Sequence, residues 1–110
     1  MKKISFIIPC FNEEKNVLII YDKIKKIYQQ QNYEVEIVFI DDGSSDNTLY
    51  ELKQIKDSDK KISTKIISFS RNFGKDSAIY AGLKNSTGDY SVIIDADLQQ
   101  NPKLTLDMVE

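Results

Sequence analysis

A chain of 110 residues, of which 41% are hydrophobic and 29% charged, is long enough to bury one modest core, so we treat residues 1–110 as one domain. Its formal net charge is −2 and its lysines are spread along the chain, which excludes a basic surface for nucleic acid. One Cys and no His exclude an internal disulfide and a Cys/His zinc site, so any metal must be bound through oxygen.

The first predicted elements are a strand and an amphipathic helix. Residues 4–8 form an apolar run that ends at Pro9, which is typical of a strand buried on both faces. This run is too short for a signal peptide or a membrane span, so we expect a cytoplasmic chain. From residue 14 to about residue 30, apolar side chains recur every three or four positions, as they do in an amphipathic helix. They are Val17, Ile20, Tyr21, Ile24, Ile27 and Tyr28.

The next pair is again a strand followed by a helix. Residues 35–40 form a β-branched, apolar run that is cut off by the polar segment 41–45. Apolar spacing over residues 49–55 indicates the helix, for which Ser44 or Ser45 is the expected N-cap.

The alternation of strands and helices continues to the end of the chain. The remaining predicted elements are a mobile surface loop at residues 57–61, a strand at 65–69, a helix at 75–84, a strand at 91–94 and a last helix that starts at Asn101 and Pro102. We expect Ala78, Ile79 and Leu83 to face inward from the third helix. Right-handed crossovers between such strands give an α/β, half-Rossmann fold, in which a parallel sheet carries helices on both faces.

Polar segments follow all four predicted strands. In an open α/β sheet, ligands bind outside the carboxyl ends of the strands, where these segments converge. They are Pro9-Cys10-Phe11-Asn12-Glu13, Asp41-Asp42-Gly43-Ser44, Ser70-Arg71-Asn72-Phe73-Gly74-Lys75 and Asp95-Ala96-Asp97-Leu98-Gln99.

Each segment also has a structural explanation when it stands alone. Asp41-Asp42-Gly43 is a common turn and helix start. An Asp-x-Asp such as Asp95 to Asp97 occurs often by chance, and Arg71 suits a role in neutralising a nearby acid. We interpret Cys10 as a small buried filler and not a nucleophile, because no His or other obvious base accompanies it.

Taken together, the segments place several carboxylates at one sheet edge, which is unfavourable unless a cation or protons compensate. Alternate residues such as Asp95 and Asp97 can turn oxygens toward one hard cation, which then takes phosphate oxygens as further ligands. Such an ion assists the departure of a diphosphate, because it neutralises the charge that develops on the leaving group. Arg71 and Lys75 add donors for a base or a phosphate.

In order and spacing, the four segments resemble those of the family 2 glycosyltransferases of GT-A fold, and the resemblance covers essentially the whole chain. The Arg71 to Lys75 segment followed by Asp95 to Gln99 is most similar to the branch of dolichyl-phosphate mannosyltransferases and bacterial polyprenyl-phosphate glycosyltransferases. The resemblance implies a GT-A-like fold and a glycosyltransferase that binds a nucleoside-diphosphate sugar. It also implies Mg or Mn as cofactor.

The resemblance implies a nucleoside pocket lined by Pro9, Phe11 and Glu13, with Asp41 recognising the base. Phe11 stands where the family usually has Tyr, so its ring can pack on the nucleoside but the hydroxyl is missing. Asp42 and Gly43 are expected beside the base and ribose, and Arg71 and Lys75 among the nucleotide-binding residues. Asp95 is expected near the ribose or the metal, and Asp97 and Gln99 on the metal with the donor diphosphate. Asn101 stands where relatives often carry Pro, and it suits a helix cap.

Members of this family continue well past residue 110, and that portion supplies most of the acceptor site, the catalytic base in inverting members and often membrane-binding segments. We therefore expect no catalytic base before Glu110, no turnover by the 110-residue chain alone, and a longer parent at the cytoplasmic face of the membrane. The sugar, the acceptor and the stereochemical outcome are decided mostly beyond Glu110.

The leading hypothesis is a donor domain for a UDP-sugar that serves transfer to a polyprenyl phosphate or a cell-envelope glycan. One alternative is a nucleotide-binding fragment without turnover. Another is a sugar nucleotidyltransferase, which is disfavoured because its Gly-rich phosphate loop is replaced here by Asn12-Glu13-Glu14.

Overall fold

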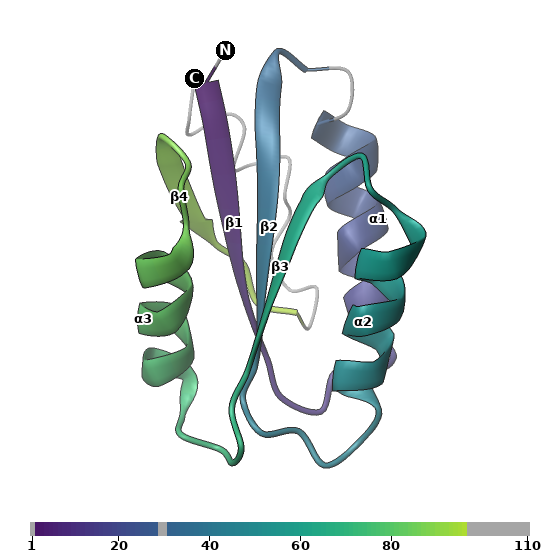
Figure 1. Cartoon of the computed structure of the whole chain (residues 1–110), viewed down its shortest axis with the longest axis vertical. Helices are drawn as coiled ribbons and strands as arrows, with labels where there is room; N and C mark the ends of the chain where they lie inside the picture. Colours follow the sequence, from purple (N-terminus) through teal and green to yellow (C-terminus); the bar gives the residue numbers. More distant parts are fainter. Residues whose placement is uncertain (1, 29–30, 97–110) are drawn as a thin grey trace.

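A four-stranded parallel sheet with helices on both faces forms the protein in the computed structural model, which describes residues 2–28 and 31–96 (Figure 1). The elements are β1 (Lys2–Cys10), α1 (Val17–Tyr28), β2 (Tyr33–Asp41), α2 (Thr48–Ser58), β3 (Ser63–Ser68), α3 (Lys75–Asn85) and β4 (Tyr90–Ile93). The strand order is β3-β2-β1-β4, with parallel pairing throughout. The predicted α/β, half-Rossmann fold is therefore confirmed.

The register of the strands places three loops at one edge of the sheet. Cys10 of β1 pairs with Asp41 of β2, and Asp41 pairs with Ser68 of β3. The pairing ladder extends slightly beyond the strands, because the Asp42 amide donates to the Cys10 carbonyl at 2.8 Å and the Phe69 amide to the Asp41 carbonyl at 2.9 Å. The segments that follow β1, β2 and β3 therefore start side by side.

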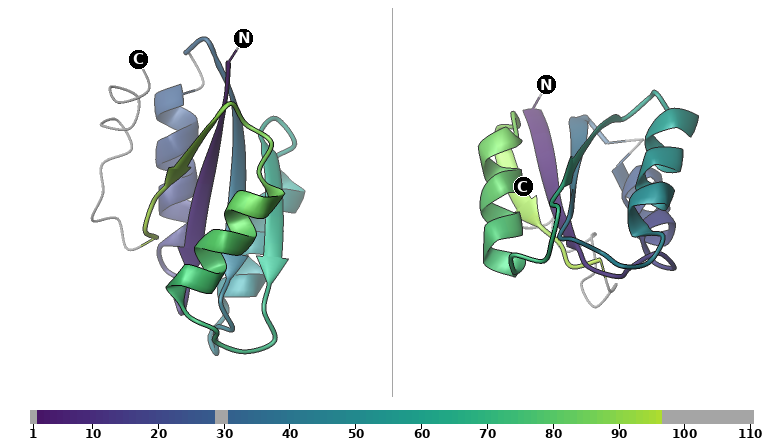
Figure 2. Two further views of the ribbon diagram at one scale, coloured as in Figure 1. Left: turned by 90° about the vertical axis from the view of Figure 1, so that its left-hand side faces the viewer. Right: turned by 60° about the horizontal axis from the view of Figure 1, so that its bottom comes forward.

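The larger core lies between the sheet and the pair α1 and α2, which cover one face together (Figure 2). Phe6 packs against Tyr28 with ring centroids 5.1 Å apart, which ties the middle of β1 to the end of α1. The fully buried aliphatic members of this core include Ile4, Ile8, Ile20, Ile24, Ile37 and Leu52.

The smaller core lies under α3, which covers the opposite face of the sheet and is the one helix on that face among residues 2–28 and 31–96. Its buried members are Ile7, Val38, Ile40 and Ala78. A Cβ at Gly82 would overlap the Ile7 side chain and lie 2.8 Å from Ile40 Cδ1. The absence of a side chain at Gly82 therefore lets α3 approach the centre of the sheet closely.

The structure corrects the predicted helix starts. α1 begins at Val17 and not at residue 14, because residues 13–16 form a turn in which the Asn16 and Val17 amides both donate to the Glu13 carbonyl. α2 begins at Thr48, and its N-cap is Asn47, which makes no side-chain cap hydrogen bond.

The predicted N-caps Ser44 and Ser45 are wrong, because both residues lie before the helix and bond to Asn12. Leu83 was predicted to face inward, but 43% of it is exposed, because Ala78 and Gly82 form the buried stripe of α3.

The predicted surface loop at residues 57–61 is shorter in the structure. α2 continues through Ser58, and Asp59 is fixed by the Tyr21 hydroxyl at 2.9 Å and the Lys25 ammonium at 2.6 Å. These bonds lower the pKa of the Asp59 carboxyl to about 2, with the Lys25 bond as the largest cause. The predicted last helix lies outside the described residues, and within the described part no helix is long and apolar enough to cross a membrane.

Candidate nucleotide-binding site

A shallow cavity of about 280 Å³ opens at the carboxyl edge of the sheet. It is lined by Pro9, Phe11 and Glu13 from the end of β1 and the loop after it, by Lys75 at the start of α3, and by Asp95 and Ala96 after β4. Three of the four polar segments therefore meet at one place, and five predicted nucleotide-binding residues lie in the lining.

Charge in this cavity is divided between two carboxylates and one ammonium group. Lys75 Nζ lies 2.5 Å from Asp95 Oδ1, and 57% of the Lys75 side chain and 32% of the Asp95 side chain are exposed. An ion pair this exposed contributes little to stability, so a ligand can replace it at small cost. Glu13 adds the second carboxylate, and its amide donates to the Thr48 hydroxyl at 2.9 Å.

The aromatic side chain of Phe11 is 48% exposed at this edge, although the core takes up most aromatic residues of β1 and β2. An exposed ring beside charged groups is suited to packing on a flat ligand such as a nucleoside base. The neighbouring Cys10 is 1% exposed. Its burial, together with the Asp41 and Glu13 carboxylates, raises the pKa of the Cys10 thiol, so the thiol stays protonated, as expected for a buried filler.

Asp41 ends β2 and is 3% exposed, with Oδ1 accepting a hydrogen bond from the Ser44 amide at 3.2 Å. It does not line the 280 Å³ cavity. The structure thus places Asp41 at the predicted edge but beneath its surface.

The loop after β1 is bonded to the loop after β2 through Asn12. Asn12 adopts a positive φ of 54°, which Asn tolerates better than most residues. Its amide donates to Ser44 Oγ at 2.8 Å, and its Oδ1 accepts from the Ser45 amide at 2.9 Å. This junction fixes Phe11 and Glu13 on either side of Asn12.

Asp46 strengthens the same connection between the two loops. Its carboxylate accepts from the Thr48 amide at 2.9 Å, from the Thr48 hydroxyl at 2.5 Å and from the Glu14 amide at 3.3 Å. Burial raises the pKa of the Asp46 carboxyl, but these hydrogen bonds outweigh burial and leave the pKa below its usual value. Sequence reasoning missed Asn12, Asp46 and Thr48 as supports of the site, although Asp46-Asn47-Thr48 at a helix start is a capping signal.

The loop after β3 is held by Asp42 and Gly43. Asp42 is 4% exposed, and its carboxylate accepts from the amides of Phe73 and Gly74. Gly43 has a φ of +71°, and a Cβ there would overlap the backbone of Arg71. The structure packs both residues against the loop after β3, and their place beside the base and ribose stays a prediction.

Arg71 and Phe73 form a small aromatic stack on that loop. The Arg71 guanidinium carbon lies 4.8 Å from the centroid of the Phe73 ring, and Phe73 meets Phe69 edge to face with centroids 5.5 Å apart. Arg71 does not line the 280 Å³ cavity.

A complete metal cage is absent from the part of the chain that the structure describes, because no three His, Cys, Asp or Glu groups converge there. Asp95 supplies one oxygen donor at the cavity, which suits Mg or Mn. The other two predicted ligands, Asp97 and Gln99, lie outside the described residues.

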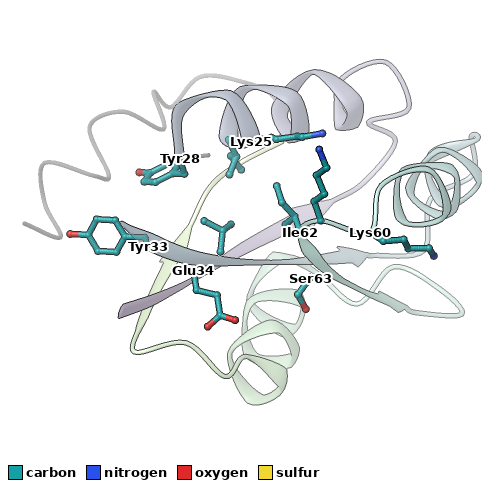
Figure 3. A pocket seen from close by; sticks show the side chains of 10 residues that line it. Lys25, Tyr28, Tyr33, Glu34, Lys60, Ile62 and Ser63 are labelled. Carbon is teal, nitrogen blue, oxygen red and sulfur yellow. The ribbon is translucent and has the colours of Figure 1, made fainter. Parts of the chain in front are cut away.

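A second cavity, of about 500 Å³, lies at the opposite edge of the sheet, between the end of α1 and the starts of β2 and β3 (Figure 3). Tyr28, Tyr33, Lys25 and Ile62 are among its lining residues. It contains none of the predicted site residues, so size alone does not identify the functional cavity here.

Comparison with known proteins decides the family. Residues 5–110 match the family model described as glycosyl transferase family 2. The chain belongs to glycosyl transferase family 2. This membership confirms the family that the four polar segments indicate.

Individual proteins are similar to this chain in sequence or in fold. The prophage bactoprenol glucosyl transferase homolog of Escherichia coli (strain K12) is 42% identical over 108 residues, which cover 98% of this chain and 35% of the relative. The structure of S. aureus TarS 1-349 in complex with UDP-GlcNAc gives a TM-score of 0.77 at 25% identity, covering 99% of this chain and 30% of that one.

The mannosyltransferase PcManGT from Pyrobaculum calidifontis, in complex with GDP-Man and Mn²⁺, gives a TM-score of 0.75 at 25% identity, covering 94% of this chain and 30% of that one. The family 2 chain spans about a third of the length of the first curated relatives it matches.

Proposed function

We propose that this family 2 chain is the donor-binding part of a glycosyltransferase, that it binds a UDP-sugar, and that its parent transfers the sugar to a polyprenyl phosphate or a cell-envelope glycan. The observation that carries the proposal is the cavity at the carboxyl edge, which collects Phe11, Glu13, Lys75 and Asp95 from three separate segments. A UDP-GlcNAc complex of a structurally similar chain supports the choice of donor. The name of the bactoprenol glucosyl transferase homolog supports a lipid-phosphate acceptor.

In the proposed complex, the nucleoside packs on the exposed ring of Phe11 and beside Pro9. The Asp41 carboxylate accepts a hydrogen bond from the uracil ring N–H. Because Oδ1 of Asp41 accepts from the Ser44 amide, Oδ2 is the oxygen that accepts from the base. Asp41 is buried in the ligand-free chain, so contact with the base requires a local movement that exposes its carboxylate.

The phosphates lie toward Lys75 and Asp95. Lys75 exchanges its exposed ion pair with Asp95 for the more highly charged diphosphate. Arg71 approaches from the loop after β3 and adds a second cationic donor.

We include Mg or Mn in this proposal, held by Asp95 together with Asp97 and Gln99. When bound, such an ion neutralises the charge that develops on the departing diphosphate. The Mn²⁺ complex of PcManGT supports this cofactor. In this chain, the carboxylate of Asp95 at the cavity supports the same cofactor.

A nucleotide-binding fragment without turnover is the second candidate for the chain alone, and it shares the same binding site. Calorimetric titration with UDP and ADP, with Mn²⁺ and with a chelator, tests the binding claim. We expect UDP to bind more tightly than ADP and more tightly with Mn²⁺ than without. If ADP binds as tightly as UDP, Asp41 does not recognise the base. If UDP binds as tightly in chelator as in Mn²⁺, the cation does not take part in binding.

An Asp41→Asn variant sharpens the test, because it keeps the shape of the side chain and the bond to Ser44. The UDP affinity of this variant is expected to fall by about tenfold, which corresponds to about 1.4 kcal/mol, while its ADP affinity stays unchanged. An equal loss for both nucleotides would mean that Asp41 supports the fold of the loop and does not read the base.

A further inference from the structure

We propose that Asp42 is a positioning residue for the donor site: its buried carboxylate holds the loop of residues 70–74 and thereby sets the placement of Arg71 and Lys75. This inference rests on the proposed function. It assigns Asp42 a role different from contact with the base or ribose.

The Asp42 carboxylate accepts three hydrogen bonds from one loop. Oδ1 accepts from the Phe73 amide at 2.8 Å, and Oδ2 accepts from the Gly74 amide at 3.1 Å and from Asn72 Nδ2 at 3.2 Å. The same Asn72 Nδ2 lies 3.2 Å from the Asp42 carbonyl oxygen. Three consecutive residues of the loop therefore bond to one side chain.

Burial makes these bonds specific for a carboxylate at this position. Asp42 is 4% exposed, so the charge has little water to stabilise it and depends on its donors. Hydrogen bonds to a charged acceptor are stronger than neutral ones. Because Asp42 is buried and three donors of one loop already bond to its carboxylate, a direct contact with ligand is disfavoured.

The loop that Asp42 holds has no helix or strand of its own between Ser68 and Lys75. Its close approach depends on Gly43, because any side chain there would overlap the backbone of Arg71 and Asn72. We call Asp42 and Gly43 together the clamp. Gly43 leaves room for the loop to approach, and the Asp42 carboxylate holds the loop through hydrogen bonds.

The clamp lies between the two cationic side chains of the loop. Arg71 precedes the clamped residues, and Lys75 follows Gly74 directly as the first residue of α3. Lys75 reaches Asp95 in the 280 Å³ cavity, so a shift of Gly74 moves a cavity side chain. The Arg71 guanidinium rests on the ring of Phe73, whose amide is one of the donors to Asp42.

The matched test compares Asp42→Asn with Glu36→Gln. Glu36 is a buried carboxylate that also accepts from several donors, but it lies in the amino-terminal half of β2, whereas Asp42 directly follows the carboxyl end of that strand. Both variants are expected to lower the unfolding temperature. At a temperature where both are folded, and with Mg²⁺ present, Asp42→Asn should weaken UDP binding by about tenfold and Glu36→Gln by less than about twofold.

Hydrogen exchange and a double-mutant cycle separate positioning from general destabilisation. Amide exchange at Phe73 and Gly74 is expected to accelerate in Asp42→Asn and to stay at the wild-type rate in Glu36→Gln. Lys75→Met should also weaken UDP binding, and Asp42→Asn should add little further loss to the Lys75→Met protein, because the clamp acts in part through Lys75.

If Asp42→Asn fails to fold, Asn72→Ala replaces it, because Asn72 is exposed and its truncation leaves the buried carboxylate with two backbone donors. It should weaken UDP binding severalfold and accelerate exchange at Phe73. Wild-type UDP affinity in the folded variant, or strictly additive losses with Lys75→Met, would overturn the inference. A wild-type protein that binds no UDP would overturn the proposed function itself. This outcome differs from the two results that would overturn only the role of Asp42.

Discussion

Replacing Glu36 with Gln removes a charge from the amino-terminal half of β2, where the carboxylate is buried on the α3 side of the sheet. Glu36 Oε2 accepts from the Ser5 hydroxyl at 2.7 Å and from the Thr87 amide at 2.9 Å, and Oε1 lies 2.7 Å from Lys65 Nζ. The Glu36 side chain is 1% exposed, whereas that of Lys65 is 39% exposed. The substitution therefore removes the negative charge of the buried partner and leaves a lysine that water can reach.

The magnitude follows from the protonation equilibrium of Glu36. Burial raises the pKa of this carboxyl, but the hydrogen bonds from Lys65, Ser5 and Thr87 outweigh it and lower the pKa from 4.5 to about 2. At about 1.4 kcal/mol per pH unit, this difference corresponds to about 3 kcal/mol of folding free energy. Because the folded-state pKa is depressed, that stabilisation is present above about pH 4.5 and is lost as the pH falls toward 2.

Urea unfolding of the wild type and Glu36→Gln, followed by circular dichroism from pH 7 to pH 2, measures this contribution. We expect a difference in the free energy of unfolding of about 3 kcal/mol at pH 7 that shrinks toward zero near pH 2. Glu34→Gln, at an exposed position of the same strand, is the control and should change stability by less than about 0.5 kcal/mol. A difference that does not vary with pH would refute the assignment of the low pKa to Glu36.

Three further substitutions test other parts of the account. Gly43→Ala should destabilise the protein by more than about 2 kcal/mol in urea unfolding, because it combines a positive φ with overlap on the Arg71 loop, and a neutral effect would contradict that packing. Gly82→Ala should lower stability by about 1 kcal/mol although Ala favours helices, because the new methyl group meets Ile7; a gain would mean that α3 is free to move outward. Asp97→Asn should leave the metal-free melting temperature level or higher and reduce the rise caused by Mn²⁺ and UDP; an undiminished rise would exclude Asp97 as a metal ligand.

The strands and their order of appearance could be predicted because buried parallel strands are continuous apolar runs. Residues 4–8 and 35–40 lie within β1 and β2, and only the flanking residues were missed. The start of α1 was placed too early, because the polar residues 14–16 fit a helix as well as the turn that they form.

The buried face of α3 could not be fully predicted from the positions of its apolar residues. The helix approaches the sheet through Ala78 and Gly82, whose small size permits close packing, while the larger Leu83 is left at the surface. The predicted burial of Ala78 is confirmed, but a pattern based on apolar residues includes Leu83 wrongly and omits Gly82.

The site could be predicted as a set of segments but not as a set of contacts. Parallel pairing brings the segments after β1 and β4 to one cavity, and this follows from topology alone. The roles of Asp42 and Asn12 depend on partners about thirty residues away, in loops whose approach is set by tertiary packing. Adjacent acidic residues such as Asp41 and Asp42 look equivalent in sequence, and only their hydrogen bonds distinguish them.

Chemical-shift mapping of the ¹⁵N-labelled protein with UDP and Mg²⁺ shows where on the molecule the nucleotide binds. We expect the largest shifts at Phe11, Glu13 and Lys75 around the 280 Å³ cavity, with little change at Tyr33 and Ile62 in the 500 Å³ cavity. Shifts concentrated at Tyr33 and Ile62, or no shifts at saturating UDP, would contradict a donor site at the carboxyl edge of the sheet.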